Sequence, residues 1–260
     1  MSPTQRLRAT LRLLVAGTLI GLAGLALMVG LPFSRLFPNP HARWNKRIYR
    51  IWARLFLLNM GVRITVRGEP PKVPFFLVTN HLSYVDIPLL ANYVDAAFIS
   101  KAEVESWPFL GTISGWAGTI FIDRSIKRDI PRVLGEIEER LSRQLGVVVF
   151  AEGTSHSGAR VHRFLPSLLQ IPAQAAYPVS YASLAYRTPP GENPAHLAVC
   201  WWGKMTFFKH FYALLGIRHF EASVTFGDQP ITDGDRKRLA ERLHRAVDSQ
   251  FVPSAPPGTE

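Results

Sequence analysis

The sequence has a single cysteine, Cys200, in a chain of 260 residues. A lone cysteine cannot form an internal disulfide, and its place in the apolar run His196–Gly203 fits a small core side chain in a reducing compartment. Neither a CxxC pair nor an HExxH motif occurs, so the usual zinc signatures are missing. We therefore expect neither a metal ion nor a bound cofactor.

The signature of a serine hydrolase is also missing. The nearest approach to G-x-S-x-G is Gly153–Ser157, which lacks glycine at its fifth position. Internal repeats and low-complexity tracts are absent as well, and the 47% hydrophobic composition is ample for a folded core. These features exclude a disordered or fibrous protein.

Acidic residues are scarce relative to basic ones. The chain has 19 Asp and Glu against 30 Lys and Arg, for a formal net charge of +11. Such an excess of basic residues is typical of proteins that bind a polyanion, either nucleic acid or an anionic membrane surface. Composition alone does not choose between these two partners.

The first apolar segment favours the membrane. Leu13–Leu31 contains no charged residue and would span about 28 Å as a helix at about 1.5 Å per residue, close to the hydrocarbon thickness of a bilayer. A cleaved signal peptide is the alternative, because Arg6, Arg8 and Arg12 form a basic n-region. The run is longer than a usual h-region, however, and no clear small-x-small cleavage site follows it.

The next segment, His41–Met60, has the pattern of a basic amphipathic helix lying in the headgroup layer. Prolines separate it from the first segment, so the first helix either crosses the bilayer or enters one leaflet only. Nucleic acid is not expected as a partner, since this densest basic cluster adjoins a membrane segment. The cations Arg43, Lys46, Arg47, Arg50 and Arg54 are interleaved with Trp44, Ile48, Ile51, Trp52, Leu55 and Phe56.

We expect three parts in the chain. Residues 1–60 would anchor the protein, residues 61–252 would form the catalytic domain, and the Pro-rich residues 253–260 would be a frayed tail. Beyond Gly61, short apolar runs alternate with helical patterns, which predicts an α/β fold with a mixed sheet flanked by helices. The expected strands are Val62–Val66, Phe75–Thr79, Ala97–Ser100, Thr119–Ile122, Val147–Phe150, Ala176–Tyr181, His196–Trp201 and Glu221–Phe226. The expected helices are Ile87–Tyr93, Trp107–Trp116, Asp129–Gln144, Phe164–Ala173 and Gly234–Phe251.

The stretch "TNHLSYVDIP", Thr79–Pro88, carries the first candidate site. A spacing of five would place His81 and Asp86 on different faces of a regular helix. Pro88 is best tolerated in a first helical turn, which puts Asp86 near the helix start and His81 in the turn before it. The carboxylate can then orient the imidazole and leave one ring nitrogen as a general base. Spacing alone favours the alternative, in which Asp86 is a simple N-cap and His81 a loop histidine without a catalytic role.

Three further blocks follow in order: Lys101–Gly111 leading into Gly118–Arg124, then Phe150–Ser155, then Tyr177–Ser180. With Asn80, His81 and Asp86 they resemble the four ordered motifs of the glycerolipid acyltransferase family, which includes bacterial lysophosphatidate acyltransferases. The resemblance covers roughly residues 61–231.

This resemblance implies direct transfer of an acyl group from an acyl carrier protein or coenzyme A thioester to a lysolipid hydroxyl, without a covalent acyl-enzyme. The first expected acceptor is 1-acylglycerol-3-phosphate, in phospholipid biosynthesis. His81 would take the hydroxyl proton, and Asp86 would orient and stabilise the imidazolium. The thioester donors are made in the cytoplasm, so we expect the catalytic domain on the cytoplasmic face of the inner membrane.

The resemblance also assigns substrate-binding positions. Lys101 and Arg124 would contact a headgroup anion. Glu152, Gly153 and Thr154 of the third motif would line the acceptor pocket, and Pro178 of the fourth would help shape the acyl or acceptor site. The alternatives are solvated surface cations and a strand-edge proline. The positions are Lys101, Arg124, Glu152, Gly153, Thr154 and Pro178.

One departure leaves the acceptor open. Many family members read Glu-Gly-Thr-Arg in the third motif, whereas Ser155 stands here in place of the arginine, with Arg160 and Arg163 close by. Residues 152–169 and 201–216 look more like the branch that acylates lyso-ornithine lipid and other bacterial lysolipids. A non-catalytic lipid-binding tether is the alternative from another class, although a tether would not need the intact set of His81, Asp86 and Glu152.

Overall fold

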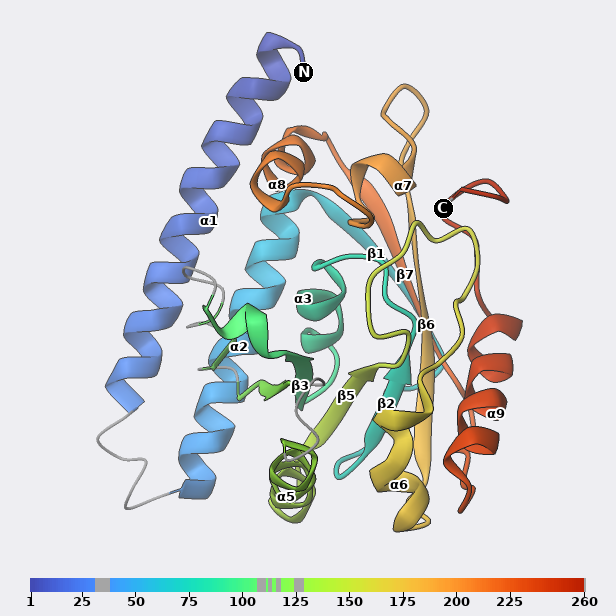
Figure 1. Cartoon of the computed structure of the whole chain (residues 1–260). Coiled ribbons are helices and arrows are strands. Elements are labelled where there is room, and N and C mark those ends of the chain that lie inside the picture. The colour runs from blue at the N-terminus through green and yellow to red at the C-terminus, as the bar shows by residue number, and fades with distance from the viewer. Residues whose placement is uncertain (31–37, 107–110, 112–113, 116–117, 124–128, 260) are drawn as a thin grey trace.

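The computed structural model describes the chain apart from residues 31–37, 107–110, 112–113, 116–117, 124–128 and 260. Within this description a seven-stranded sheet has helices on both faces (Figure 1), so the predicted mixed sheet flanked by helices is confirmed. Its order is β1-β7-β6-β2-β5-β3-β4. The strands are β1 Val62–Arg67, β2 Phe76–Thr79, β3 Ala96–Lys101, β4 Ile120–Ile122, β5 Gly146–Phe150, β6 Val179–Arg187 and β7 Phe220–Phe226.

All neighbouring strands run parallel except β6 and β7, which are antiparallel. The central strand β2 lies between β5 and β6, with Phe76 opposite both Val147 and Val179. β2 and β5 are buried along their whole length, which explains why their sequences are continuous apolar runs rather than alternating ones. Because β2 and β5 run parallel, their carboxyl ends meet at one edge of the sheet.

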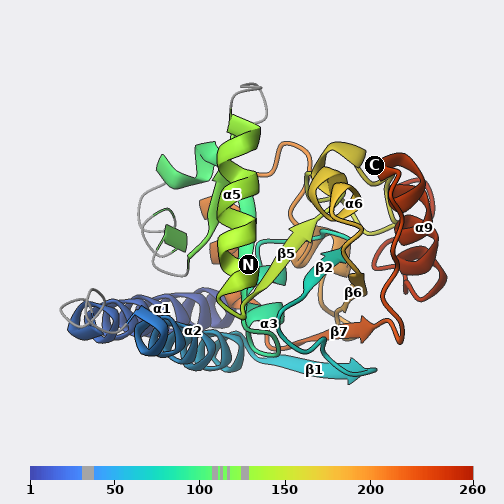
Figure 2. The same ribbon diagram turned by 90° about the horizontal axis from the view of Figure 1, so that it is seen from below.

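Helices separate into two groups, one on each face of the sheet (Figure 2). The side chains of Leu77 on β2 and Leu89 on α3 share one core, and those of Phe76 and Ile137 share the other. On the first face lie α1 Pro3–Gly30, α2 Pro38–Met60, α3 Asp86–Ala91, α7 Ala195–Ala198 and α8 Phe207–Gly216. On the second lie α5 Asp129–Ser142, α6 Gln170–Gln174 and α9 Arg236–Ser249, together with the 3₁₀ turn η3 Pro166–Leu169. A second 3₁₀ turn, η2 Ala102–Ser106, follows β3.

Helix α1 packs along α2 and α8 (Figure 1). The Arg12 guanidinium donates hydrogen bonds to the carbonyl oxygens of Leu215, Ile217 and Arg218, where α8 ends. The last carbonyls of a helix have no partner within it, so Arg12 supplies a donor to Leu215 at the end of α8 and to Ile217 and Arg218, which follow the helix. Within the described residues, α1 is the one helix long and apolar enough to cross a membrane. Only 17% of its most apolar window is buried, so most of this window faces outward.

Helix α2 is amphipathic, but two of its cations do not point where the sequence predicted. The Lys46 ammonium donates to the carbonyl oxygen of Ala96 at 2.6 Å, and Arg50 pairs with Asp95 at 2.8 Å. These contacts hold α2 against the start of β3 instead of placing both cations in the headgroup layer.

The apolar side of α2 is divided in a similar way. Phe56 is buried, and its ring stacks on Trp52 and Phe211. It is therefore a core residue, and the prediction that it lies in the headgroup layer is wrong, because its ring packs between Trp52 and Phe211 of α8. The large apolar side chains of α2 that are exposed are Trp44, Ile51, Leu55 and Leu58.

Three further predictions need correction. The expected strand His196–Trp201 is instead the short helix α7 and an irregular segment, because the carbonyl of Pro194 accepts the first helical hydrogen bonds. The strand expected from Ala176 begins at Val179, because Ala176 has a positive φ of 46° and Pro178 has no N–H. The helix expected at Phe164–Ala173 is divided into η3 and α6, and most of the helix expected at Trp107–Trp116 lies outside the described residues.

The C-terminal segment is docked on the domain. The N–H of Ser254 donates to the carbonyl of Gly158 at 2.8 Å, its hydroxyl accepts from the N–H of Tyr186, and Ala255 is buried. The prediction of a frayed tail is therefore wrong for residues 253–259.

Candidate active site

His81 and Asp86 lie where the central strand ends. β2 stops at Thr79, and α3 begins at Asp86. The imidazole Nδ1 of His81 lies 2.7 Å from Oδ2 of Asp86, which also accepts hydrogen bonds from the N–H groups of Leu82 and Ser83. Asp86 is therefore not a side-chain cap of α3: its carboxylate holds the turn that precedes the helix and contacts the imidazole at the same time.

The chemistry of this pair follows from burial. The Asp86 side chain is fully buried, and that of His81 is 19% exposed. An ionised carboxylate can only accept hydrogen bonds, so Nδ1 of His81 carries the proton and donates it. The other ring nitrogen, Nε2, then has a free lone pair that can accept a proton from a bound hydroxyl.

Two further motif side chains, Asn80 and Glu152, hold the turn that carries His81. The Asn80 amide bridges to the main chain of Leu184 on β6, accepting at 2.8 Å and donating at 3.0 Å. The Glu152 carboxylate accepts from the N–H of His81 and, at 2.6 Å, from that of His162.

The main chain around His81 is clamped from the other side as well. The carbonyl of His81 accepts from the N–H of His156 at 3.0 Å, and the carbonyl of Leu82 accepts from that of Trp201 at 2.8 Å. The imidazole ring also stacks on Phe150, with ring centroids 4.0 Å apart. The direction of the imidazole is therefore set by both its backbone and its ring contacts.

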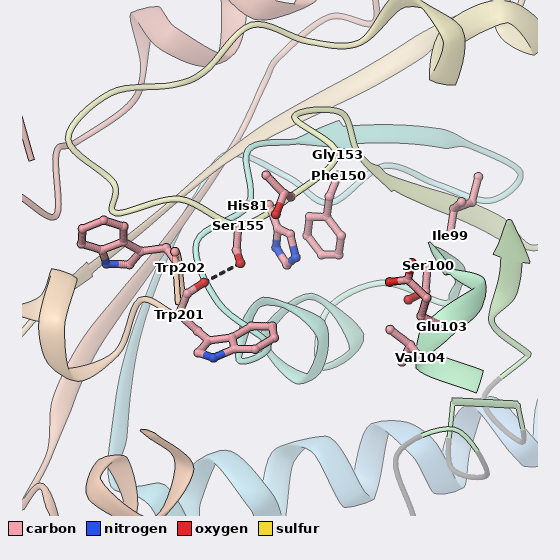
Figure 3. Close-up of a pocket in the computed structure, with 12 residues that line it drawn as sticks. His81, Ile99, Ser100, Glu103, Val104, Phe150, Gly153, Ser155, Trp201 and Trp202 are labelled. Atoms are coloured by element: carbon pink, nitrogen blue, oxygen red, sulfur yellow. Dashed lines mark hydrogen bonds between the residues drawn. The ribbon is translucent and has the colours of Figure 1, made fainter. Parts of the chain in front are cut away.

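A cavity of about 340 Å³ opens beside His81. Figure 3 shows the imidazole and Phe150 in the middle, with Trp201 on one side and Ser100 and Glu103 on the other. The volume lies within the range of small-molecule sites. The lining residues are His81, Ile99, Ser100, Glu103, Val104, Phe150, Gly153, Thr154, Ser155, Trp201, Trp202 and Gly203.

The third motif contributes to this cavity in two different ways. Gly153 and Thr154 line it, and Gly153 has a φ of 78°, a left-handed conformation that favours glycine. Glu152 was predicted to line the pocket as well, but it is buried behind the wall. Burial raises the pKa of Glu152 to about 8, against the opposing effect of its two N–H donors.

Ser155, which stands at the position of the family arginine, ties two walls together. Its hydroxyl donates to the carbonyl oxygen of Trp201 at 2.5 Å (dashed line in Figure 3). Sequence reasoning missed Trp201 and Trp202, because their apolar run read as a buried strand. It also missed Glu103, although this residue lies inside the second motif.

The remaining predicted positions lie elsewhere or outside the description. Lys101 ends β3, but its side chain is not among those described, and Arg124 lies outside the described residues. Pro178 does not reach the His81 cavity. It precedes β6, whose first residue pairs with the start of β2, and it lines a second cavity of about 520 Å³ at that opposite end.

A search of the described residues finds no group of three or more His, Cys, Asp or Glu side chains placed to hold a metal ion. The described cavity lining contains two ionisable side chains, those of His81 and Glu103. His81 contacts Asp86 through Nδ1, so its other ring nitrogen can accept a proton.

A mixed α/β sheet that presents a histidine–aspartate pair to a cavity is an arrangement typical of enzymes, and comparisons with known proteins show the family. A family model described as Acyltransferase matches residues 63–184. The lyso-ornithine lipid O-acyltransferase of Pseudomonas aeruginosa is 32% identical over 69% of this chain and 70% of its own. The protein of the same name from Rhodobacter capsulatus is 30% identical over 88% and 87%. The chain belongs to the glycerolipid acyltransferase family.

Two further comparisons bear on acceptor and fold. The 1-acyl-sn-glycerol-3-phosphate acyltransferase of Neisseria gonorrhoeae is 32% identical over 57% of this chain and 61% of its own. The crystal structure of the 1-acyl-sn-glycerophosphate acyltransferase PlsC from Thermotoga maritima matches with a TM-score of 0.62 and 20% identity, over 93% of this chain and 97% of the other. At this identity the likeness establishes the shared fold.

Proposed function

We propose that the protein transfers a fatty acyl group from a thioester to the free hydroxyl of a lysolipid with an amino-acid headgroup, such as lyso-ornithine lipid. The observation that carries the reaction is the His81–Asp86 pair at the cavity. The reaction rests on His81, and the choice of acceptor rests on Ser155 and Glu103.

In the first step, Nε2 of His81 takes the proton of the acceptor hydroxyl as its oxygen bonds to the thioester carbonyl carbon. Asp86 stabilises the imidazolium that forms. The tetrahedral intermediate then collapses, the carbon–sulfur bond breaks, and the imidazolium returns its proton to the leaving thiolate. The products are the diacyl lipid and the free thiol of acyl carrier protein or coenzyme A, and no acyl group is bonded to the enzyme.

The acceptor is inferred from charge. Ser155 is neutral, so this position supplies no cation for a phosphate. Its hydroxyl donates to the carbonyl of Trp201. The Glu103 carboxylate lines the cavity opposite Trp201 (Figure 3). A carboxylate attracts the free amine of an ornithine headgroup and repels a phosphate monoester, and an indole face also suits a cation. Two relatives carry the name lyso-ornithine lipid O-acyltransferase, which supports this choice.

The membrane is the proposed site of action. The outward apolar side chains of α1 and α2 would bury in lipid, with the catalytic domain on the cytoplasmic face of the inner membrane, where the thioester donors are made. The lysolipid would then reach the cavity beside His81 from the bilayer surface.

The test is an acceptor panel. Lyso-ornithine lipid and lysophosphatidate of equal chain length are compared by kcat/KM, each with both donor types. We expect lyso-ornithine lipid to be preferred, and Glu103→Gln to reduce its kcat/KM by roughly tenfold, since a hydrogen bond to a charged group is lost. Glu105→Gln on the same 3₁₀ turn, which does not line the cavity, is the matched control.

A preference of the wild-type enzyme for lysophosphatidate would instead support 1-acylglycerol-3-phosphate, the acceptor named for the Neisseria relative. Equal losses in Glu103→Gln and Glu105→Gln would remove Glu103 from headgroup recognition.

A further inference from the structure

Asp86 has a hydrogen-bond partner that none of the four motifs contains. The phenol of Tyr186 lies 2.6 Å from Oδ1 of Asp86, while Oδ2 of the same carboxylate contacts Nδ1 of His81. Tyr186 comes from β6, so the contact joins two parts of the chain that are 100 residues apart.

The surroundings of Tyr186 leave its ring one position. The side chain is buried at 3% exposure, and its ring meets that of Phe220 edge-on at 6.0 Å. Its backbone pairs with Ala222 of β7, and its N–H donates to the hydroxyl of Ser254 in the docked C-terminal segment. Strand β7 and the C-terminal segment therefore both hold Tyr186 in place beside Asp86.

The direction of this hydrogen bond is also fixed. An ionised carboxylate has no proton to give, so the Tyr186 hydroxyl must be the donor. Burial, and after it the negative charge of Asp86, raises the pKa of the Tyr186 phenol well above its ordinary value. The phenol therefore remains a donor throughout the pH range in which the enzyme is assayed.

We propose that Tyr186 is a positioning residue for acyl transfer: by donating to Oδ1 it fixes the plane of the Asp86 carboxylate and sets how strongly Oδ2 holds the proton on Nδ1 of His81. This inference rests on the proposed general-base role of His81. Tyr186 touches neither substrate nor the cavity, and it acts through Asp86.

A change at Tyr186 should therefore appear in the pH dependence of turnover. Without the phenol, Oδ1 is a buried acceptor with no partner, and more negative charge remains on Oδ2. Oδ2 then favours the imidazolium, so the base-competent neutral imidazole forms only at higher pH. The acid limb of the kcat profile moves upward.

Other titratable groups face this pair and must be held constant. The first is Glu152, whose carboxylate contacts the main chain of His81. The second is Cys200, whose pKa is raised by burial and by the negative charge of Asp86. The third is Tyr84, whose charge when ionised would raise the pKa of Tyr186. Burial raises the pKa of Glu152 to about 8, within the range of the assay. Since all three are kept in every variant, a difference between variants isolates Tyr186.

The experiment compares two changes of opposite effect at one position. Tyr186→Phe removes the donor, and 3-fluorotyrosine at 186 strengthens it, because fluorine makes the phenol more acidic. Tyr181→Phe is the control, since Tyr181 lies on the same strand but lines the second cavity. kcat and KM are measured from about pH 5 to 9, in mixed micelles that contain the lysolipid and a thioester donor.

We expect Tyr186→Phe to lower kcat by roughly tenfold at neutral pH with KM little changed, and to shift the acid limb upward by about half a pH unit or more. Fluorotyrosine should shift the limb downward, and Tyr181→Phe should not shift it. Opposite shifts cannot come from a purely structural role, which would lower the active fraction equally at all pH values.

The proposal is overturned if the acid limb stays in place for both changes at Tyr186, or if both move it in the same direction. If Tyr186→Phe does not fold, the fluorotyrosine protein decides alone, because it retains the ring and the hydroxyl. Failure of the proposed function is a separate result: it would be seen as full turnover in a folded His81→Ala protein, which the Tyr186 measurements do not produce.

Discussion

Glu152 is a buried carboxylate that holds the main chain of the turn that carries His81 instead of lining the cavity. It accepts from the N–H groups of His81 and His162 and is 6% exposed. Burial disfavours its charged form, which raises its pKa from an ordinary 4.5 to about 8. The folded state therefore binds a proton that the unfolded chain releases near pH 4.5.

This difference predicts how stability depends on pH. Between about pH 4.5 and 8 the folded state holds more protons than the unfolded state, so the contribution of Glu152 to stability falls as pH rises and is flat above about 8. Glu152→Gln cannot titrate and should lack this slope. The free energy of unfolding of both proteins, measured at intervals from pH 5 to 9, tests the prediction.

The control is Glu138→Gln, a change at an exposed residue of α5, which should preserve the wild-type slope. Parallel pH dependences in wild type and Glu152→Gln would mean that Glu152 remains ionised throughout the range. In that case its two N–H donors would outweigh burial.

At the residue scale, the sequence could predict local contacts but not distant ones. The contact of His81 with Asp86 followed from a spacing of five and from Pro88, which are local features. Tyr186 could not be predicted from any such pattern, because its partner lies 100 residues away. Glu152 was recognised by motif, yet its burial depends on packing that no short pattern encodes.

Among the elements, α8 connects the N-terminal helix to the turn that carries His81. Its C-terminal carbonyls accept hydrogen bonds from Arg12 on α1, and its His210 is bonded to the hydroxyl of Tyr84 at 2.9 Å. Tyr84 lies in the same turn as His81. Helix α1 is therefore part of the support of the active site as well as an apolar surface.

Removing the guanidinium should loosen this connection. Arg12→Met leaves the carbonyls of Leu215, Ile217 and Arg218 without their donor, at a cost of about 1–3 kcal/mol in the free energy of unfolding. We expect faster amide hydrogen exchange in α8 and a lower kcat. Arg6→Met, at an exposed position of the same helix, is the control, and equal exchange in α8 of both variants would contradict the prediction.

Element positions were predicted well where burial alone determines them. The apolar runs of β2 and β5 predicted central strands because parallel strands are covered on both faces. The run His196–Trp201 is equally apolar but is packed as a short helix and a cavity wall, and composition does not distinguish these cases. The direction of the cations on α2 likewise depends on Asp95 and Ala96 of the catalytic domain, which the helix pattern does not contain.

In the whole molecule, the strand topology brings the motifs together. β2 and β5 are neighbouring parallel strands, so His81 after β2 and Gly153 after β5 meet at one edge of the sheet, where open α/β sheets commonly bind ligands. Pro178, which precedes β6, lies at the opposite edge by the same rule. The order of the motifs predicted the family, and the parallel pairing decides which of their residues share the cavity.

The outer surface fits an enzyme that acts on lipids. Helices α1 and α2 lie side by side along one flank of the molecule (Figure 1), and their apolar side chains are exposed there. Because α1 is held to α8 and α2 along its length, this surface belongs to the folded domain. The exposed apolar residues on the two helices are Leu7, Leu11, Leu13, Leu14, Val15, Leu22, Leu25, Met28, Val29, Trp44, Ile51, Leu55 and Leu58.

The central claim is that Nε2 of His81 is the base for acyl transfer, and the most direct measurement is the turnover of His81→Ala. Labelled acyl thioester and lyso-ornithine lipid are supplied to the purified variant, to wild type and to His219→Ala, whose histidine does not line the cavity. Unfolding temperatures show that each protein is folded. We predict a loss of roughly 10²–10⁴-fold in kcat for His81→Ala and near wild-type turnover for His219→Ala. A folded His81→Ala protein with wild-type turnover would contradict the account.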